Sequence, residues 1–225
     1  MDNNNFFYVI PQLRLKDGSI KCRPNGKRAL REAFFKQGDL DGACGVYSFL
    51  MALAILGTFE PGKVLTPTMD LLTNKEKAFI RELNKHGLYR KGLSGKALKS
   101  ILDTSFNSSL KVVYRQNEDI CVSMQEIIDH LDEGVPVILG LINSKRDFYH
   151  WVLAVGYQND DLGEVSSLMT LDPAASEPWL GYWNGILNLS SDGNALAYLT
   201  DYTKGGEMPV ELEDSLYITR KPNKR

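Results

Sequence analysis

Residues 37–56 read QGDLDGACGVYSFLMALAIL. The first part of this stretch is a short, polar, glycine-rich loop. Its second part, from Cys44 onward, is apolar almost all round until Gly57. A helix that is apolar on every side is buried inside a domain, and a glycine just past the last apolar residue is typical of a helix C-terminus. We therefore expect a loop that runs directly into a buried helix over residues 44–56.

Cys44 stands at the predicted start of this helix. The backbone N–H groups and the dipole at a helix N-terminus stabilise a thiolate, and the same N–H groups can hold the oxyanion of a tetrahedral intermediate. Gln37, just upstream, offers a side-chain amide as a further donor. Asp39 and Asp41 are better suited to orienting the loop or capping the helix, because carboxylates close to Cys44 would oppose thiolate formation.

The segments up to residue 133 are mainly of helical type. Ser123 and Glu126 form a capping-box pattern, which predicts a helix from Ser123 to about Glu133 with Gly134 just past its end. A short aromatic and β-branched run predicts a strand at residues 6–10. Apolar side chains recur at helical spacing in three further segments, which are residues 27–36, 74–85 and 95–103.

Beyond residue 134 the pattern changes to short strands separated by turn residues such as Asp192-Gly193-Asn194. The predicted strands are residues 135–142, 150–157, 165–172, 195–199 and 215–219. Consecutive strands with short connections pair antiparallel, so the predicted fold class is α+β. We expect a single domain over residues 1–225, with a helical half at about 27–133 packed on an antiparallel sheet half at about 134–220, and a cleft between them.

Of the three histidines, His150 is the one whose position has no sufficient structural explanation. His86 follows a predicted helix end and His130 lies within a predicted helix, whereas His150 opens an apolar strand. Asp172 ends the next strand, so a hairpin between the two strands would bring His150 and Asp172 to the same end of the sheet. A carboxylate there could hold one imidazole nitrogen and leave the other as a base. The alternative for Asp172 is to cap a turn before Pro173.

The three cysteines are an odd number without paired spacing, which argues against a disulfide framework and for a reducing compartment. Cys22 and Cys121 are expected to be small packing residues. No second histidine or cysteine stands at metal-ligand spacing, so we expect no metal site and no cofactor.

The formal net charge of -2 gives no general attraction to nucleic acid or to an anionic membrane surface. The longest apolar stretch, residues 46–56, is too short to span a bilayer, so no membrane insertion is expected. The polar N-terminus lacks the order of a signal peptide. A cytoplasmic protein is expected, and delivery by a specialised secretion system stays open. No pattern indicates the oligomeric state.

Aromatic side chains gather near the candidate residues. Core packing is one explanation for Trp151. Trp179 and Trp183 lie in a loop-like stretch with Pro178 and Gly181, where aromatic rings either wall a substrate cleft or simply pack. Trp151, Trp179 and Trp183 are therefore candidate substrate-binding residues.

A glutamine followed shortly by an aspartate, and then Cys-Gly opening an apolar helix, resembles papain-like cysteine peptidases. The later stretch HWVLAVGY at 150–157 and Leu-Asp-Pro at 171–173 resemble in particular the C39-like branch, which uses Cys, His and Asp. The resemblance implies a papain-like fold, Cys44 as nucleophile, His150 as base, Asp172 as orienting acid and Gln37 in the oxyanion hole.

These residues predict a thiol-dependent hydrolase that cleaves peptide or isopeptide bonds in a protein or peptide substrate through an acyl-enzyme. A second hypothesis is another acyl transfer on the same triad, by a deamidase, transglutaminase or acyltransferase, since all of these pass through an acyl-enzyme. A bacterial toxin or effector is compatible with either. A third hypothesis is an inactive binding module on the same fold.

Overall fold

The computed structural model of the chain describes residues 7–24, 28–38, 42–59, 72–85, 92–116, 119–190, 195–203 and 206–222. Within these ranges, four β-strands are followed by three α-helices, then by one strand, a fourth helix and six further strands. His86 and the turn predicted at Asp192-Gly193-Asn194 lie outside the described residues.

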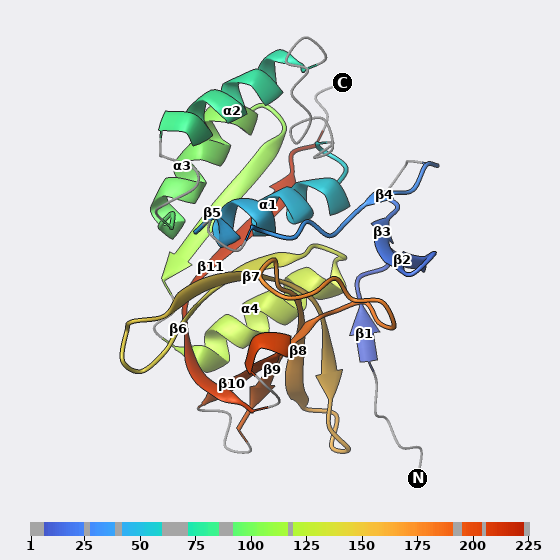
Figure 1. Ribbon diagram of the computed structural model, residues 1–225, viewed down its shortest axis with the longest axis vertical. Coiled ribbons are helices and arrows are strands. Elements are labelled where there is room, and N and C mark those ends of the chain that lie inside the picture. Colours follow the sequence, from blue (N-terminus) through green and yellow to red (C-terminus); the bar gives the residue numbers. More distant parts are fainter. Residues whose placement is uncertain are drawn as a thin grey trace.

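Six antiparallel strands pair in a closed circuit, each hydrogen-bonded to the next and the last to the first (Figure 1). Closure removes the unpaired edges that an open sheet would present. All five strands predicted beyond residue 134 are present, and β9 was missed. The strands, in order around the barrel, are β6 (Val137–Ile142), β7 (Tyr149–Asn159), β8 (Val165–Leu171), β9 (Gly185–Leu189), β10 (Leu196–Thr200) and β11 (Met208–Arg220).

Two strands from the first half of the chain extend this sheet. β1 (Phe7–Val9) pairs with the second half of β7, and β5 (Leu110–Gln116) pairs with the second half of β11. The helical half expected at about 27–133 is not confirmed, because β5 lies within this range and belongs to the sheet. β7 and β11 are long enough to carry a second partner along one edge. The coarser expectation, a mixed fold of helices and antiparallel sheet, is confirmed.

The helix expected at residues 27–36 is also wrong. Part of this segment is β4 (Arg31–Glu32), the edge of a small sheet with β2 (Leu13–Lys16) and β3 (Ser19–Cys22). The Ala33 N–H continues the pairing by donating to the Ile20 carbonyl at 3.1 Å. The helical spacing of apolar residues over 27–36 was therefore overridden by the hydrogen bonds of this small sheet.

The central helix is α1 (Cys44–Ile55), and eleven of its twelve residues are buried. One side of α1 packs on β7 and β6. On another side, Phe49 meets Phe79 of α2 (Asn74–Lys85), with ring centroids 5.2 Å apart, and Phe79 meets Phe106 of α3 (Gly95–Phe106). The buried helix was therefore correctly predicted, as were α2 and α3, although α3 runs three residues past its predicted end.

α4 (Ile120–Asp132) also packs on β6 and β7, on the side away from α1 (Figure 1). It begins at Ile120 because the Asp119 carboxylate accepts from the N–H groups of Cys121 and Val122, at 2.9 and 3.2 Å. The start predicted at Ser123 is therefore wrong, since a better N-cap stands four residues earlier. The end was correctly predicted: the φ of Gly134 is +73°, as expected of a residue that closes a helix.

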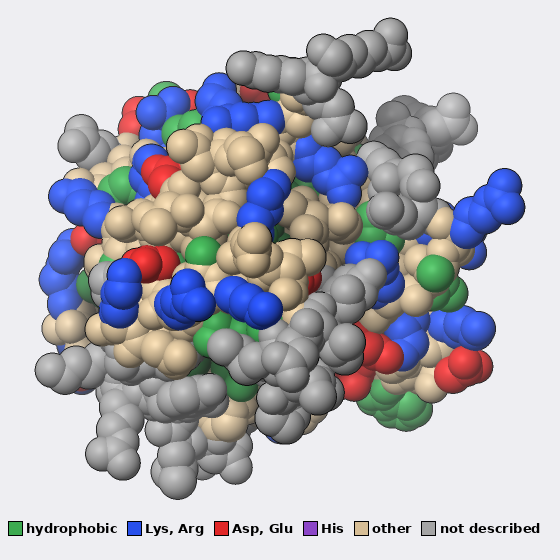
Figure 2. Space-filling view, turned by 90° about the horizontal axis from the view of Figure 1, so that it is seen from above, with side chains coloured by type: hydrophobic (Ala, Val, Ile, Leu, Met, Phe, Trp, Pro, Cys, Tyr) green, Lys and Arg blue, Asp and Glu red, His purple; other side chains and the backbone are tan. Residues whose placement is uncertain are grey.

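The end of the molecule that carries α2 and α3 is shown in Figure 2, where Lys and Arg side chains are spread over the surface with Asp and Glu between them. No helix among the described residues is both long enough and apolar enough to cross a membrane.

Candidate active site

Cys44 is the first residue of α1, and the residue before it, Ala43, has no side-chain oxygen that could cap the helix. The first N–H groups of a helix have no partner within the helix. These N–H groups can therefore donate to a group bound next to the Cys44 side chain. The Cys44 side chain is mostly buried, but it lines a cavity of about 700 Å³. A thiol at an open helix N-terminus, facing a cavity, has both the electrostatics and the access that a nucleophile needs.

His150 and Asp172 lie together on the barrel, beside the same cavity. The pairing of β7 with β8 is the hairpin expected from the sequence, and it places Nε2 of His150 2.7 Å from Oδ1 of Asp172. His150 is 6 % exposed and Asp172 is fully buried. Cys44 also forms a hydrogen bond with the imidazole. Because Nε2 faces the carboxylate, Nδ1 is the nitrogen that can exchange a proton with the thiol.

Asp172 is held in place by several hydrogen bonds besides the one to His150. Its Oδ2 accepts from the Tyr198 hydroxyl at 2.6 Å, and its Oδ1 accepts from the Ala174 N–H at 2.7 Å. The backbone of Asp172 is fixed by Asn184, whose side chain accepts from the Asp172 N–H at 2.6 Å and donates to its carbonyl at 2.9 Å. A carboxylate held at both oxygens can orient the imidazole without turning away from it.

These contacts determine the charge states of the pair. Burial by itself lowers the pKa of His150, but the Asp172 carboxylate and the hydrogen bonds to Asp172 and Cys44 outweigh it and raise the pKa to about 10. Burial raises the pKa of Asp172, but the His150 charge and the hydrogen bonds from His150, Tyr198 and Ala174 lower it below its usual value. At neutral pH the pair is therefore an imidazolium held by a carboxylate.

Gln37 lines the same cavity as Cys44. Its backbone N–H donates to the carbonyl of Pro173 at 2.8 Å, which links the loop before α1 to the turn that carries Asp172. Its side-chain Oε1 is buried and has no hydrogen-bond partner among the described residues. A half-turn of the side-chain amide would place Nε2, a donor, at the same position.

Trp151 packs against the start of α1, next to Cys44. A Cβ atom added to Gly45 would lie 2.9 Å from Cδ1 of Trp151, so the indole packs directly against the backbone that follows Cys44. The indole Nε1–H donates to the Leu93 carbonyl at 2.9 Å. Trp151 is fully buried, so it packs in the core as well as lining the floor of the cavity.

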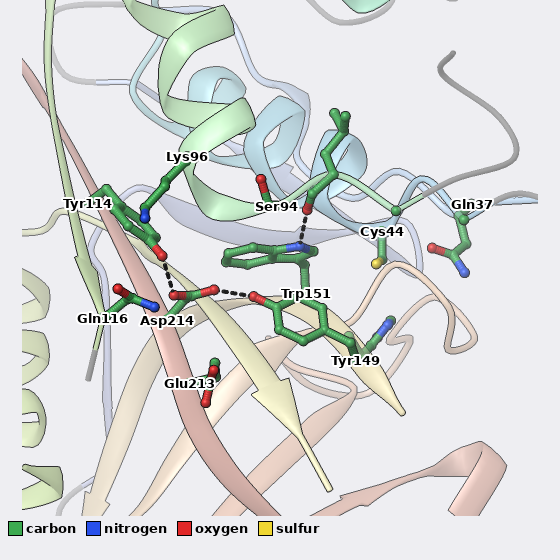
Figure 3. Close-up of a pocket in the computed structure, with 14 residues that line it drawn as sticks. Gln37, Cys44, Ser94, Lys96, Tyr114, Gln116, Tyr149, Trp151, Glu213 and Asp214 are labelled. Carbon is green, nitrogen blue, oxygen red and sulfur yellow. Dashed lines mark hydrogen bonds between the residues drawn. The ribbon is translucent and has the colours of Figure 1, made fainter. Parts of the chain in front are cut away.

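The cavity continues away from Cys44 towards a second polar group. The hydroxyls of Tyr114 and Tyr149 both donate to Asp214, the former at 2.6 Å. Cys44 and Gln37 lie at one end of the cavity and Tyr114 and Asp214 at the other, with the Trp151 and Tyr149 rings between them (Figure 3). No group of three His, Cys, Asp or Glu side chains suited to a metal ion occurs in the described part of the chain.

The structure brings together five of the seven candidate site residues at this cavity or directly behind it: Gln37, Cys44, His150, Trp151 and Asp172. It does not place the other two there. Trp179 is 69 % exposed, and Trp183 stacks on Phe7 with ring centroids 5.9 Å apart. The proposed roles of Trp179 and Trp183 in substrate binding stay predictions without support from this geometry.

Sequence reasoning missed Tyr198, Asn184 and Asp214. Tyr198 and Asn184 reach Asp172 through the closure of the barrel, which no local pattern reveals. Asp214 had a usable signal, because it is a carboxylate in a strand whose buried positions are mostly apolar. An acidic side chain buried in such a strand needs hydrogen-bonding partners, and two tyrosine hydroxyls provide them.

The family model described as Peptidase_C39 like family matches residues 30–185. No curated protein matches the sequence. Among solved structures, the crystal structure of UfSP from C. elegans aligns with a TM-score of 0.45 and 11 % sequence identity, over 99 % of this chain and 35 % of that chain. The chain thus spans about a third of the length of that protein.

Proposed function

The chain belongs to the Peptidase C39-like family, and we propose that it is a papain-like cysteine peptidase in which Cys44, His150 and Asp172 cleave peptide bonds. Family membership gives the coarser statement, a hydrolase of the cysteine-peptidase type. The roles of the three residues are our proposal. The observation that carries it is the buried hydrogen bond of 2.7 Å between His150 and Asp172, made by an imidazole that also bonds Cys44 at the mouth of a cavity.

In the first half of the reaction, Sγ of Cys44 attacks the carbonyl carbon of the scissile bond as a thiolate. The negative charge moves to the carbonyl oxygen, where the N–H of Cys44 and the amide of Gln37 stabilise it. The His150 imidazolium then gives its Nδ1 proton to the leaving amine. The C–N bond breaks and a thioester on Cys44 remains.

In the second half, the neutral imidazole of His150 takes a proton from water as the water oxygen attacks the thioester. Collapse of this intermediate releases the carboxylate product and regenerates Cys44 and the imidazolium. Asp172 keeps Nε2 of His150 protonated and oriented throughout, since it bonds that nitrogen from a buried position.

N-terminal proteomics tests this proposal. A mixture of cellular proteins is treated with wild-type protein, with Cys44→Ala, or with Cys121→Ala as a control that alters an exposed thiol away from the cavity. New N-termini should appear with wild type and the control, and not with Cys44→Ala. Cleavage in heavy-oxygen water should place one heavy oxygen in each new carboxylate. Equal cleavage by Cys44→Ala would refute the proposal, and transfer to added amines in place of water would identify an acyl transferase.

A further inference from the structure

The cavity beyond Cys44 ends in a polar group that the mechanism does not use. Asp214 is buried in β11, and its two carboxylate oxygens accept from the hydroxyls of Tyr114 and Tyr149. Within the described part of the chain, no Lys or Arg forms an ion pair with Asp214. A buried carboxylate without a cationic partner is costly for a protein to keep, so its position beside the candidate nucleophile requires an explanation.

Glycines stand at positions where any side chain would collide with Asp214 or its two tyrosine partners. A Cβ atom on Gly140 would lie 2.7 Å from the Tyr149 hydroxyl and 3.1 Å from Cβ of Asp214. A Cβ atom on Gly95 would lie 2.2 Å from the Tyr114 ring. The pairing of β11 with β6 also shifts register between Leu212 and Asp214, a bulge of the kind that re-aims side chains beside active sites.

The hydrogen-bonding capacity that remains is that of acceptors. Burial, together with the hydrogen bond and charge of Asp214, raises the pKa of both Tyr114 and Tyr149, so both phenols stay protonated. Each phenol donates its single O–H in a hydrogen bond to Asp214. These three side chains therefore offer the cavity lone pairs on the carboxylate and phenol oxygens, and the Gln116 amide lies beside them (Figure 3). Glu213, which also lines the cavity, adds a second carboxylate, although its side chain pairs with Arg146 at 3.3 Å.

Aromatic faces complete the lining. Tyr149 meets Trp151 edge to face, with centroids 5.4 Å apart, and both rings lie between Cys44 and Asp214 (Figure 3). Rings of this kind attract cations, most strongly after desolvation. Within the described residues, Lys96 is the cation that lines the cavity; it is exposed, and Figure 3 draws it at the Tyr114 end.

We propose that this part of the cavity is a specificity subsite for a substrate side chain that carries a positive charge, lysine or arginine, close to the scissile bond. The inference rests on the proposed function, because it assumes that acyl transfer takes place at Cys44. Asp214 would form the ionic contact with the substrate side chain, and the rings of Tyr149 and Trp151 would pack along its aliphatic part.

The test uses peptidyl acyloxymethyl ketones, which alkylate a cysteine nucleophile from within the substrate cleft. The probes vary one residue, either the first or the second on the acyl side of the reactive group. Two matched pairs compare Lys with norleucine and Arg with citrulline, and a further probe carries Glu. The rate of Cys44 alkylation is measured by mass spectrometry. The cationic member of at least one pair should react about tenfold faster or more, because a charge-assisted contact replaces a neutral one.

Asp214→Asn should reduce that ratio to about threefold or less, and Glu213→Gln should reduce it by a smaller amount because Arg146 already compensates Glu213. Glu211→Gln is the matched control: the same strand and an exposed carboxylate, but outside the cavity. It should leave the ratio as in wild type. If Asp214→Asn does not fold, the wild-type ratios and Glu213→Gln still decide.

Alkylation of Cys44 at equal rates within both pairs would overturn the subsite and leave the proposed function standing. A preference for the Glu probe would overturn it too, and would point to Lys96. Failure of every probe to alkylate Cys44, in protein that melts cooperatively, would refute the proposed function and the subsite with it.

Discussion

Nε2 of His150 lies 2.7 Å from Oδ1 of the fully buried Asp172, and this bond joins the start of one barrel strand to the end of the next. It determines which imidazole nitrogen faces the carboxylate, and therefore which one serves Cys44. It also places the imidazolium charge beside a helix N-terminus that favours thiolate.

Asp172→Asn should lower activity less than Cys44→Ala or His150→Ala does, since Asp172 orients and charges the imidazole but does not react. We expect at least about tenfold more residual kcat/KM than in Cys44→Ala. The pKa of His150 should fall when its carboxylate partner is removed, so the alkaline limb of the pH–rate profile should move to lower pH. An alkaline limb at the wild-type position would show that Asp172 does not support the imidazolium.

Tyr198→Phe removes the hydrogen bond to Oδ2 of Asp172. We expect a loss of about 1–3 kcal/mol in the free energy of unfolding and a reduced kcat/KM. The pKa of Asp172 should rise, which moves the acidic limb of the profile upward. Tyr157→Phe is the control, because its hydroxyl donates to Asp132, at 2.7 Å, far from the cavity. Identical pH profiles for the two variants would contradict a role for Tyr198.

Gly45→Ala should be destabilising, because the new Cβ would lie 2.9 Å from Trp151 and 3.0 Å from Leu98. Overpacking of this kind costs about 1–3 kcal/mol, and any shift of the backbone displaces Cys44. In Gly181→Ala the nearest atom would be 4.0 Å away, so that variant serves as the control. Chemical denaturation measures both. Equal stability of the two alanine variants would mean that Trp151 does not brace α1.

The stability of the protein should depend on pH through the same pair. The pKa of His150 is raised in the fold, to about 10, so its contribution is complete below the unfolded value of about 6.5 and is lost as the pH rises towards 10. The pKa of Asp172 is lowered, so its contribution is present above about pH 4 and lost in acid. Urea denaturation at pH 7 and pH 10 should show a decrease that His150→Gln removes. An equal decrease in His150→Gln would assign it to other groups.

Local patterns predicted much of this site. Cys44 follows from the start of an apolar helix, and the proximity of His150 to Asp172 follows from one hairpin. The patterns failed where the structure of a segment depends on its pairing with a distant part of the chain. Residues 27–36 have helical spacing, yet they pair with β3. The Asp17-Gly18 turn between β2 and β3, with φ of +53° and +72°, is a strong hairpin signal that was overlooked. Tyr198 meets Asp172 only because the barrel closes through β8, β9 and β10.

Limiting iodoacetamide, followed by mass spectrometry of all three cysteines, tests the central claim most directly. Cys22 should stay unmodified, since burial raises its pKa to about 12. Cys44 is 7 % exposed and Cys121 is exposed, so access alone predicts that Cys121 reacts first. Our account predicts the reverse, with Cys44 fastest at neutral pH in wild type and slowed below Cys121 in His150→Ala. Fastest labelling of Cys121, with a Cys44 rate that His150→Ala does not change, would contradict it.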